Sequence, residues 1–181
     1  MFRKFGFVVI ALTGLAACGG TTSTPQLGPD GKPLPKVYNI RQGQTAKVQF
    51  SMLDSVNTLR EAAGAPPLAL NAQLNAAAAT HAQDMSLQNR PWHFGSDGSS
   101  PIDRIQRVGY TGQLVGENIS ETYETEIETL SAWMEDENTR RVILSPAATD
   151  LGFSWFQESN GKIWWTMVTG SRSGRSLDPL S

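Results

Sequence analysis

The sequence predicts an α+β domain, in which helices come first along the chain and antiparallel strands come last. Two observations predict this class. Apolar residues recur at helical spacing through the first half of the domain, and apolar residues alternate along the chain near its carboxyl end. In addition, Ser159-Asn160-Gly161 separates two alternating segments, which is a strong signal for a β-hairpin.

The helices are predicted from apolar spacing and from the residues that end each run. Gly64 stops the first run just before two prolines, Asn71 caps the second, and Gly109 ends the third. Small alanine side chains in the second helix permit close approach to a neighbouring element. The four predicted helices extend over residues 45–64, 71–89, 100–108 and 124–141.

The strands are predicted where aromatic and β-branched residues alternate. Phe153 and Trp155 alternate in the segment 151–157, and Ile163, Trp165 and Met167 alternate in the segment 162–169. A shorter alternation over residues 37–40 predicts a possible short strand.

The first 18 residues have the pattern of a bacterial lipoprotein signal peptide. Arg3 and Lys4 precede an apolar segment that is too short to remain as a membrane span, and Leu15-Ala16-Ala17-Cys18 closely resembles a lipobox. The resemblance implies cleavage after residue 17, lipid on Cys18 and a membrane as partner. Gly19 resembles the sorting signal for the outer membrane. The alternative is an ordinary signal peptide that is cut nearby, with Cys18 incidental.

The expected organisation is a signal peptide (1–17), a lipidated cysteine with a flexible linker (18–44), one domain (45–170) and a disordered tail (171–181). Cys18 is the only cysteine, so the chain has no intrachain disulfide. The formal charge is −2 and no basic cluster is present, which argues against a nucleic-acid partner.

The chemistry of the chain is expected between Pro91 and Asn118. His93 is one of only two histidines, and two turn-forming segments separate it from Glu117, so the chain can bring the two side chains together. An imidazole beside a carboxylate can perform acid–base chemistry, bind a metal or recognise a polar ligand. It can equally be a buried structural hydrogen bond that fixes the two turns.

Two further residues near this stretch have competing interpretations. His81 lies on the apolar face of the second predicted helix, which favours a buried histidine over a ligand. Trp92 precedes His93 and can form the aromatic wall of a cleft, although packing in the core is the more common role for tryptophan.

From about Phe50 to Gly170 the chain resembles a bacterial CAP domain, named after cysteine-rich secretory proteins, antigen five and pathogenesis-related proteins. The ordered set of matching segments carries the resemblance, because each segment alone is weak. The matching segments are Pro67-Leu68-Ala69-Leu70-Asn71, His81-Ala82-Gln83-Asp84-Met85, Trp92-His93-Phe94-Gly95, Gly116-Glu117-Asn118-Ile119 and Trp133-Met134. The resemblance implies an α-β-α sandwich with a central antiparallel sheet.

The resemblance also implies a cleft with two histidines and acidic partners, of which this chain retains part. His93 matches the first histidine and Glu117 matches the glutamate of the Gly-Glu-Asn motif, but Thr139 stands where the second histidine is expected. A threonine hydroxyl ligates metal poorly, and a stable zinc site needs three or four ligands. We therefore expect no cofactor and at most weak binding of a divalent cation by His93 and Glu117.

Three functions are compatible with this sequence. The first is a non-catalytic module that binds a lipid, glycan or protein of the cell envelope, and it is the preferred one. The second is a hydrolase with His93 as general base and Glu117 as its orienting partner. The third is a purely structural envelope lipoprotein. The expected location is the outer membrane, facing the periplasm.

Overall fold

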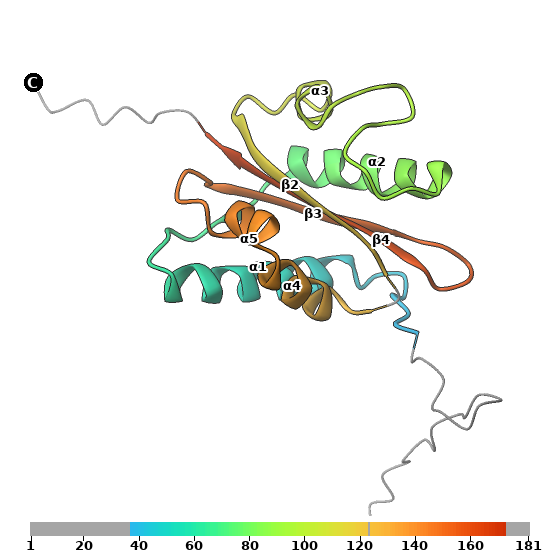
Figure 1. Cartoon of the computed structure of the whole chain (residues 1–181), viewed down its shortest axis with the longest axis horizontal. Helices are drawn as coiled ribbons and strands as arrows, with labels where there is room; N and C mark the ends of the chain where they lie inside the picture. Colours follow the sequence, from blue (N-terminus) through green and yellow to red (C-terminus); the bar gives the residue numbers. More distant parts are fainter. Residues whose placement is uncertain (1–36, 123, 173–181) are drawn as a thin grey trace, which may run out of the picture. The chain divides into compact units, whose positions relative to one another are not determined.

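The computed structural model describes residues 37–122 and 124–172, which form a four-stranded sheet between two layers of helices (Figure 1). The helices α1, α4 and α5 cover one face of the sheet, and α2 and α3 lie on the other. This is the predicted α+β sandwich. The elements in chain order are α1 (Thr45–Ala62), β1 (Ala69–Leu70), α2 (Ala72–Gln88), α3 (Pro101–Arg107), β2 (Gln113–Thr122), α4 (Glu126–Glu135), α5 (Glu137–Leu144), β3 (Asp150–Gln157) and β4 (Ile163–Ser171).

The sheet has the strand order β1-β3-β4-β2, so β2 is an edge strand. The three long strands are antiparallel, with the predicted hairpin joining β3 and β4. The two-residue strand β1 pairs with β3 in parallel, which makes the sheet mixed rather than wholly antiparallel. In β2, Glu117 lies opposite Val168 and Asn118 lies opposite Met167. Because side chains alternate along a strand, these two residues point to opposite faces of the sheet.

Each face of the sheet has its own hydrophobic core. The larger core lies under α1, α4 and α5, where Phe153 stacks on Trp165 with ring centroids 5.3 Å apart. On the other face α2 approaches the sheet closely at Gly152, where an added Cβ would lie only 2.2 Å from the carbonyl carbon of Leu74. The alanines of α2 and this glycine therefore set a short distance between helix and sheet.

A buried arginine joins α1 to the segment that leads into β3. The Arg60 side chain is fully buried, and its guanidinium donates hydrogen bonds to four backbone carbonyls. The four acceptors are Pro66 (2.7 Å), Ile143 (2.6 Å), Ser145 (3.0 Å) and Ala148 (3.3 Å). These carbonyls come from segments far apart in the chain, so Arg60 fixes their relative positions.

Several elements differ from those that the sequence predicts. The predicted helix over 124–141 is two helices, because Asp136 has an extended backbone and its side chain caps α5. The strand β2 was not predicted. Residues 37–40 form no strand, but Gln157 accepts a hydrogen bond from the Ile40 amide and donates one to the Tyr38 carbonyl. The predicted linker is therefore attached to the domain over these residues.

The carboxyl end of the domain also lies further along the chain than predicted. Ser171 belongs to β4, and Arg172 forms an ion pair with the buried Asp150. The predicted signal peptide, Cys18, the predicted linker up to residue 36 and the tail from residue 173 lie outside the described residues. Within the described ranges, no helix combines the length and apolar character that a membrane span requires.

Candidate functional site

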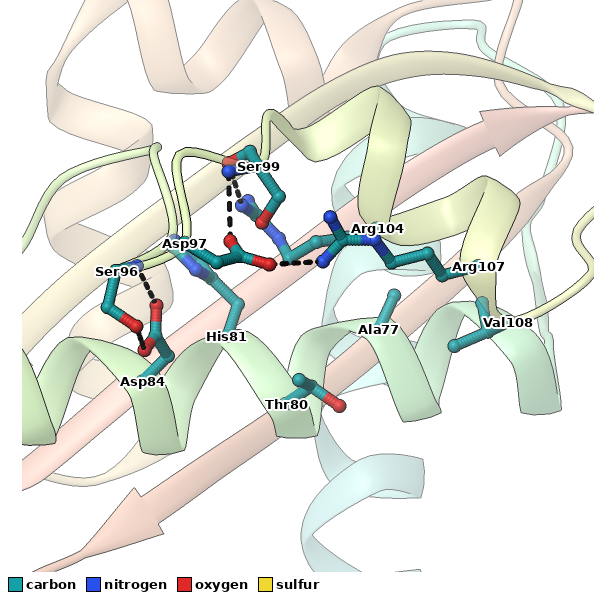
Figure 2. A pocket seen from close by; sticks show the side chains of 10 residues that line it. All are labelled: Ala77, Thr80, His81, Asp84, Ser96, Asp97, Ser99, Arg104, Arg107 and Val108. Atoms are coloured by element: carbon teal, nitrogen blue, oxygen red, sulfur yellow. Dashed lines mark hydrogen bonds and ion pairs between the residues drawn. The ribbon is translucent and has the colours of Figure 1, made fainter.

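The loop between α2 and α3 is held in place by its own polar residues (Figure 2). The carboxylate of Asp84 on α2 accepts hydrogen bonds from the amide and hydroxyl of Ser96, at 2.7 and 2.6 Å. The hydroxyl of Ser100 and the carboxylate of Asp103 then form a capping box at the start of α3. These contacts fix the path of the chain from Ser96 to α3, which directly follows the segment that carries His93.

The Asp97 carboxylate stabilises a turn in the same loop. It accepts the Ser99 amide at 2.9 Å and forms an ion pair with Arg107. Hydrogen bonds from Ser99, followed by those from Arg107, hold the pKa of Asp97 well below its ordinary value. Asp97 is therefore ionised throughout the physiological range of pH.

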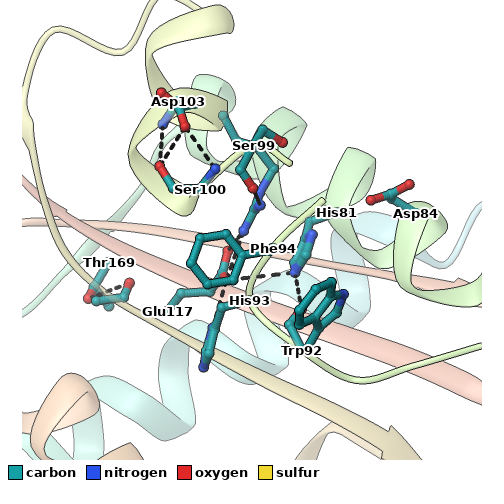
Figure 3. A network of polar contacts seen from close by, with 12 residues as sticks. His81, Asp84, Trp92, His93, Phe94, Ser99, Ser100, Asp103, Glu117 and Thr169 are labelled. Carbon is teal, nitrogen blue, oxygen red and sulfur yellow. Dashed lines mark hydrogen bonds and ion pairs between the residues drawn. The ribbon is translucent and has the colours of Figure 1, made fainter. Parts of the chain in front are cut away.

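Glu117 is the centre of the candidate site (Figure 3). Its side chain is 2% exposed and projects from the edge strand β2 toward α2 and α3. Nη2 of Arg104 contacts both carboxylate oxygens, at 2.9 and 2.7 Å, and Nη1 of Arg104 donates to the Ser99 carbonyl. The buried negative charge of Glu117 is thus paired with a buried positive charge, as a buried carboxylate requires.

His93 contacts the same carboxylate from the exposed side. Its Nδ1 lies 2.9 Å from Oε1 of Glu117, and its side chain is 51% exposed. A carboxylate only accepts hydrogen bonds, so Nδ1 carries the hydrogen. Nε2 is then the available acceptor of the neutral ring. The structure thus brings together the two residues singled out in the sequence.

His81 is a third partner of Glu117, and the sequence did not predict this contact. It is fully buried, with Nε2 2.9 Å from the Trp92 carbonyl and 3.7 Å from Oε1 of Glu117. Burial lowers the pKa of His81, the Glu117 charge opposes that shift, and the Arg104 charge adds to it. The buried position agrees with its place on the apolar face of α2.

Trp92 packs beside the site rather than in the core. Its ring is half-buried and belongs to none of the three core clusters, so the favoured expectation of core packing is wrong. Its Nε1 donates to Gln88, the guanidinium of Arg90 lies 3.9 Å from its ring centroid, and its ring contacts Phe94. Phe94 is 49% exposed, so two aromatic rings flank His93 along the chain. Exposed aromatic rings of this kind are common contacts in binding sites.

Thr139 makes its own contacts with the α4–α5 layer. Its hydroxyl donates to the Trp133 carbonyl at 2.6 Å, and its carbonyl accepts a hydrogen bond from the Asn118 amide group at 3.0 Å. The neighbouring residues Glu117 and Asn118 point to opposite faces of the sheet, so Thr139 contacts the residue beside Glu117 rather than Glu117 itself. Over residues 37–122 and 124–172, no group of three or more histidine, cysteine or acidic side chains is arranged to hold a metal ion.

A separate apolar groove lies between α1 and α4. It has a volume of about 370 Å³, and its apolar lining comes from Leu59, Ile127, Leu130 and Met134. Ile127 is 41% exposed there. The sequence analysis did not identify this groove, because its two walls come from helices that are distant in the chain.

Comparisons with known proteins agree with this fold. The model of the Cysteine-rich secretory protein family, known as CAP, matches residues 53–169. The chain is 30% identical over 119 residues to the uncharacterized protein YkwD of Bacillus subtilis (strain 168). That alignment covers 66% of this chain and 46% of YkwD, so the chain spans about half the length of this relative.

Two solved structures share the architecture. An extracellular protein containing an SCP domain from Bacillus anthracis str. Ames has a TM-score of 0.66 and 25% identity, over 82% of this chain and 45% of that one. An outer surface protein from Borrelia burgdorferi has a TM-score of 0.65 and 16% identity, over 76% of this chain and 99% of that one. The family model covers more than half of the sequence, and the chain therefore belongs to the cysteine-rich secretory protein family.

Proposed function

We propose that this chain is a non-catalytic binding module of the bacterial cell envelope, held by lipid on Cys18, and that His93 contacts the polar group of its ligand. The observation that carries the proposal is the state of Glu117. Both of its oxygens are occupied by Arg104, and Oε1 also accepts from His93. The carboxylate therefore orients the His93 ring and leaves Nε2 free to meet a ligand.

The surroundings of His93 favour a ligand that is partly apolar. Phe94 and the half-buried Trp92 supply aromatic surface next to the imidazole. Among the lipid, glycan and protein ligands that the sequence leaves open, this aromatic surface favours a lipid.

The envelope location is supported by the names of two structural neighbours, one an extracellular protein and the other an outer surface protein. The lipobox at Cys18 and the following Gly19 support a lipid anchor and the outer membrane, with the domain facing the periplasm.

A hydrolase is the less supported alternative. The His93–Glu117 pair has the geometry of a base with its orienting carboxylate. However, within the described residues no serine or threonine hydroxyl is hydrogen-bonded to His93, so a water molecule would have to be the nucleophile. A purely structural lipoprotein, the third possibility, leaves the half-exposed His93 ring without a role.

The test is the binding of a fluorescent fatty acid and of phosphatidylglycerol vesicles to the purified protein. We expect saturable binding that is weakened at least tenfold in His93→Ala, while Leu87→Ala, an exposed apolar control on α2, binds like the wild type. Equal binding by His93→Ala would contradict the proposal. Ester or peptide hydrolysis that depends on His93 would show instead that the site is catalytic.

A further inference from the structure

A second cavity lies against the loop that follows His93. It has a volume of about 250 Å³ and lies between α2 and the segment from Ser96 to Val108 (Figure 2). Neither His93, Trp92 nor Glu117 lines it, although His81 and Arg104 belong both to its lining and to the cluster around Glu117. Its polar and charged lining comes chiefly from His81, Asp84, Ser96, Asp97, Arg104 and Arg107.

His81 lines this cavity, and its ring carries a buried hydrogen-bond acceptor without a partner among the described residues. Its Nε2 faces the Trp92 carbonyl and Glu117, which are both acceptors, so Nε2 carries the hydrogen. Burial lowers the pKa of the ring, which is therefore neutral near pH 7. Nδ1 then has a free lone pair, and it is buried without a donor among the described residues. A buried acceptor without a partner is costly, so a donor at this position is strongly favoured.

The charges around the cavity leave one carboxylate without a cationic partner. Arg104 is paired with Glu117, and Arg107 is paired with Asp97. Asp84 accepts hydrogen bonds from Ser96 and Gln88, which are neutral groups, and no cation among the described residues forms an ion pair with it. Its charge also acts on His81, since it favours the protonated imidazole. The cavity therefore combines an acceptor nitrogen with an unneutralised negative charge.

We infer that this cavity binds a small molecule that carries a primary ammonium group, which donates hydrogen bonds to His81 Nδ1 and to the Asp84 carboxylate. An ammonium group supplies a positive charge for Asp84 and an N–H donor for His81 Nδ1, while both arginines of the lining are already paired with other carboxylates. A metal ion is a poorer match, because the described residues contain no cluster of three metal-ligand side chains. The inference is independent of the ligand proposed at His93.

The two-histidine composition of the chain permits a direct test by nuclear magnetic resonance. In the uniformly ¹⁵N-labelled full chain only two imidazole rings contribute, and His93→Asn assigns them. Titration with methylammonium chloride is expected to shift the ¹⁵N resonance of His81 Nδ1 saturably, as a bare nitrogen becomes an acceptor. Tetramethylammonium has the same charge but no N–H donor, so it should leave this resonance in place. Equal shifts with both ions, or none with methylammonium, would overturn the inference.

A pair of matched variants locates the binding. Thr80 is exposed, lines the cavity and bonds to the carbonyl four residues earlier, so Thr80→Phe fills the space without disturbing the core. Thr58 on α1 makes the same kind of bond but lies outside the cavity. We expect Thr80→Phe to weaken methylammonium binding at least tenfold and Thr58→Phe to leave it unchanged. Equal binding in both variants would place the ammonium elsewhere. Tighter binding of ethanolamine or glucosamine than of methylammonium would support the assignment and identify the larger ligand.

Discussion

Two buried arginines, Arg60 and Arg104, show how the same side chain serves the scaffold in one place and the candidate site in another. Arg60 is fully buried and donates only to backbone carbonyls. Arg104 is 5% exposed and donates to the Glu117 carboxylate, which also contacts two imidazoles. Carbonyls do not titrate, so the surroundings of Arg60 are independent of pH, whereas those of Arg104 include two titratable rings.

Burial alone therefore does not identify a functional charge. The nature of the acceptor does. A guanidinium among carbonyls fixes the backbone, while a guanidinium on a shared carboxylate fixes the charge state of a cluster. Substitutions at the two kinds of site should therefore differ in their cost to stability.

Arg60→Met should be the most destabilising change. It removes the donor from four carbonyls, of which three belong to buried or half-buried residues. We therefore expect a loss of about 4 kcal/mol or more in the free energy of unfolding, at roughly 1–3 kcal/mol for each buried group left unpaired. Urea denaturation measures this loss. The exposed Arg41→Met is the control and should melt like the wild type. A loss smaller than that of Glu117→Gln would show that Arg60 contributes less to the stability of the fold than the Arg104–Glu117 pair does.

Glu117→Gln should come next, because it leaves the buried Arg104 without a counter-charge. Removing one member of a buried ion pair costs about 3–5 kcal/mol, and we expect the lower end because His93 opens the cluster to solvent. In a double-mutant cycle with Arg104→Met, the two losses should be strongly non-additive, since the second change removes a partner that is already unpaired. Additive losses in urea melts would show that the pair does not stabilise the fold.

The unfolding free energy should depend on pH through His81. Its pKa is lowered in the folded state, so folding favours the neutral ring. This contribution is fully present above the unfolded pKa of about 6.5 and is lost as the pH falls through the folded value. His81→Gln retains an N–H donor for the Trp92 carbonyl but does not titrate. Its free energy of unfolding should therefore fall less steeply than that of the wild type as the pH drops below about 6.5. Parallel stability curves for the wild type and this variant would contradict the assignment.

His93→Ala should have the smallest effect on stability. Its ring is half-exposed and donates a single hydrogen bond to Glu117, so we expect a loss below about 1 kcal/mol. The coupling of His93 with Glu117 should accordingly be weaker than that of Arg104 with Glu117. A loss as large as that of Glu117→Gln would make His93 part of the scaffold and would remove the reason to regard it as a ligand contact.

The sequence predicted the layered fold because most elements are marked by signals in their own local sequence. The hairpin at residues 159–161, the Asn71 cap and the end of the third helix depend on neighbouring residues alone. The strand β2 escaped prediction because Gly116, Glu117 and Asn118 interrupt its apolar pattern, and its pairing with β4 joins residues far apart in the chain. The break at Asp136 was missed because helix-forming residues continue on both sides of it.

The candidate site was predicted in part for the same reason. His93 and Glu117 are predicted because one of the two histidines of the chain and a carboxylate each lie beside a turn. Arg104 and His81 complete the cluster but lie on helices whose own spacing predicts only a buried face. Their roles depend on how α2 and α3 meet over β2, which no local pattern specifies. Phe94 was likewise missed as an exposed ring, because sequence does not distinguish a surface aromatic from a core one.

The glycine at position 152 has a consequence for the candidate site. His81 and Leu74 belong to the same rigid helix, and Leu74 rests on the backbone at Gly152. A methyl group at that position would act as a wedge beneath the helix and would tilt it away from the sheet. Because His81 is on this helix and Glu117 is on the sheet, the distance between them would then increase. The distances between the charged groups of the cluster thus depend on the absence of a side chain at Gly152, an uncharged residue that does not contact the site.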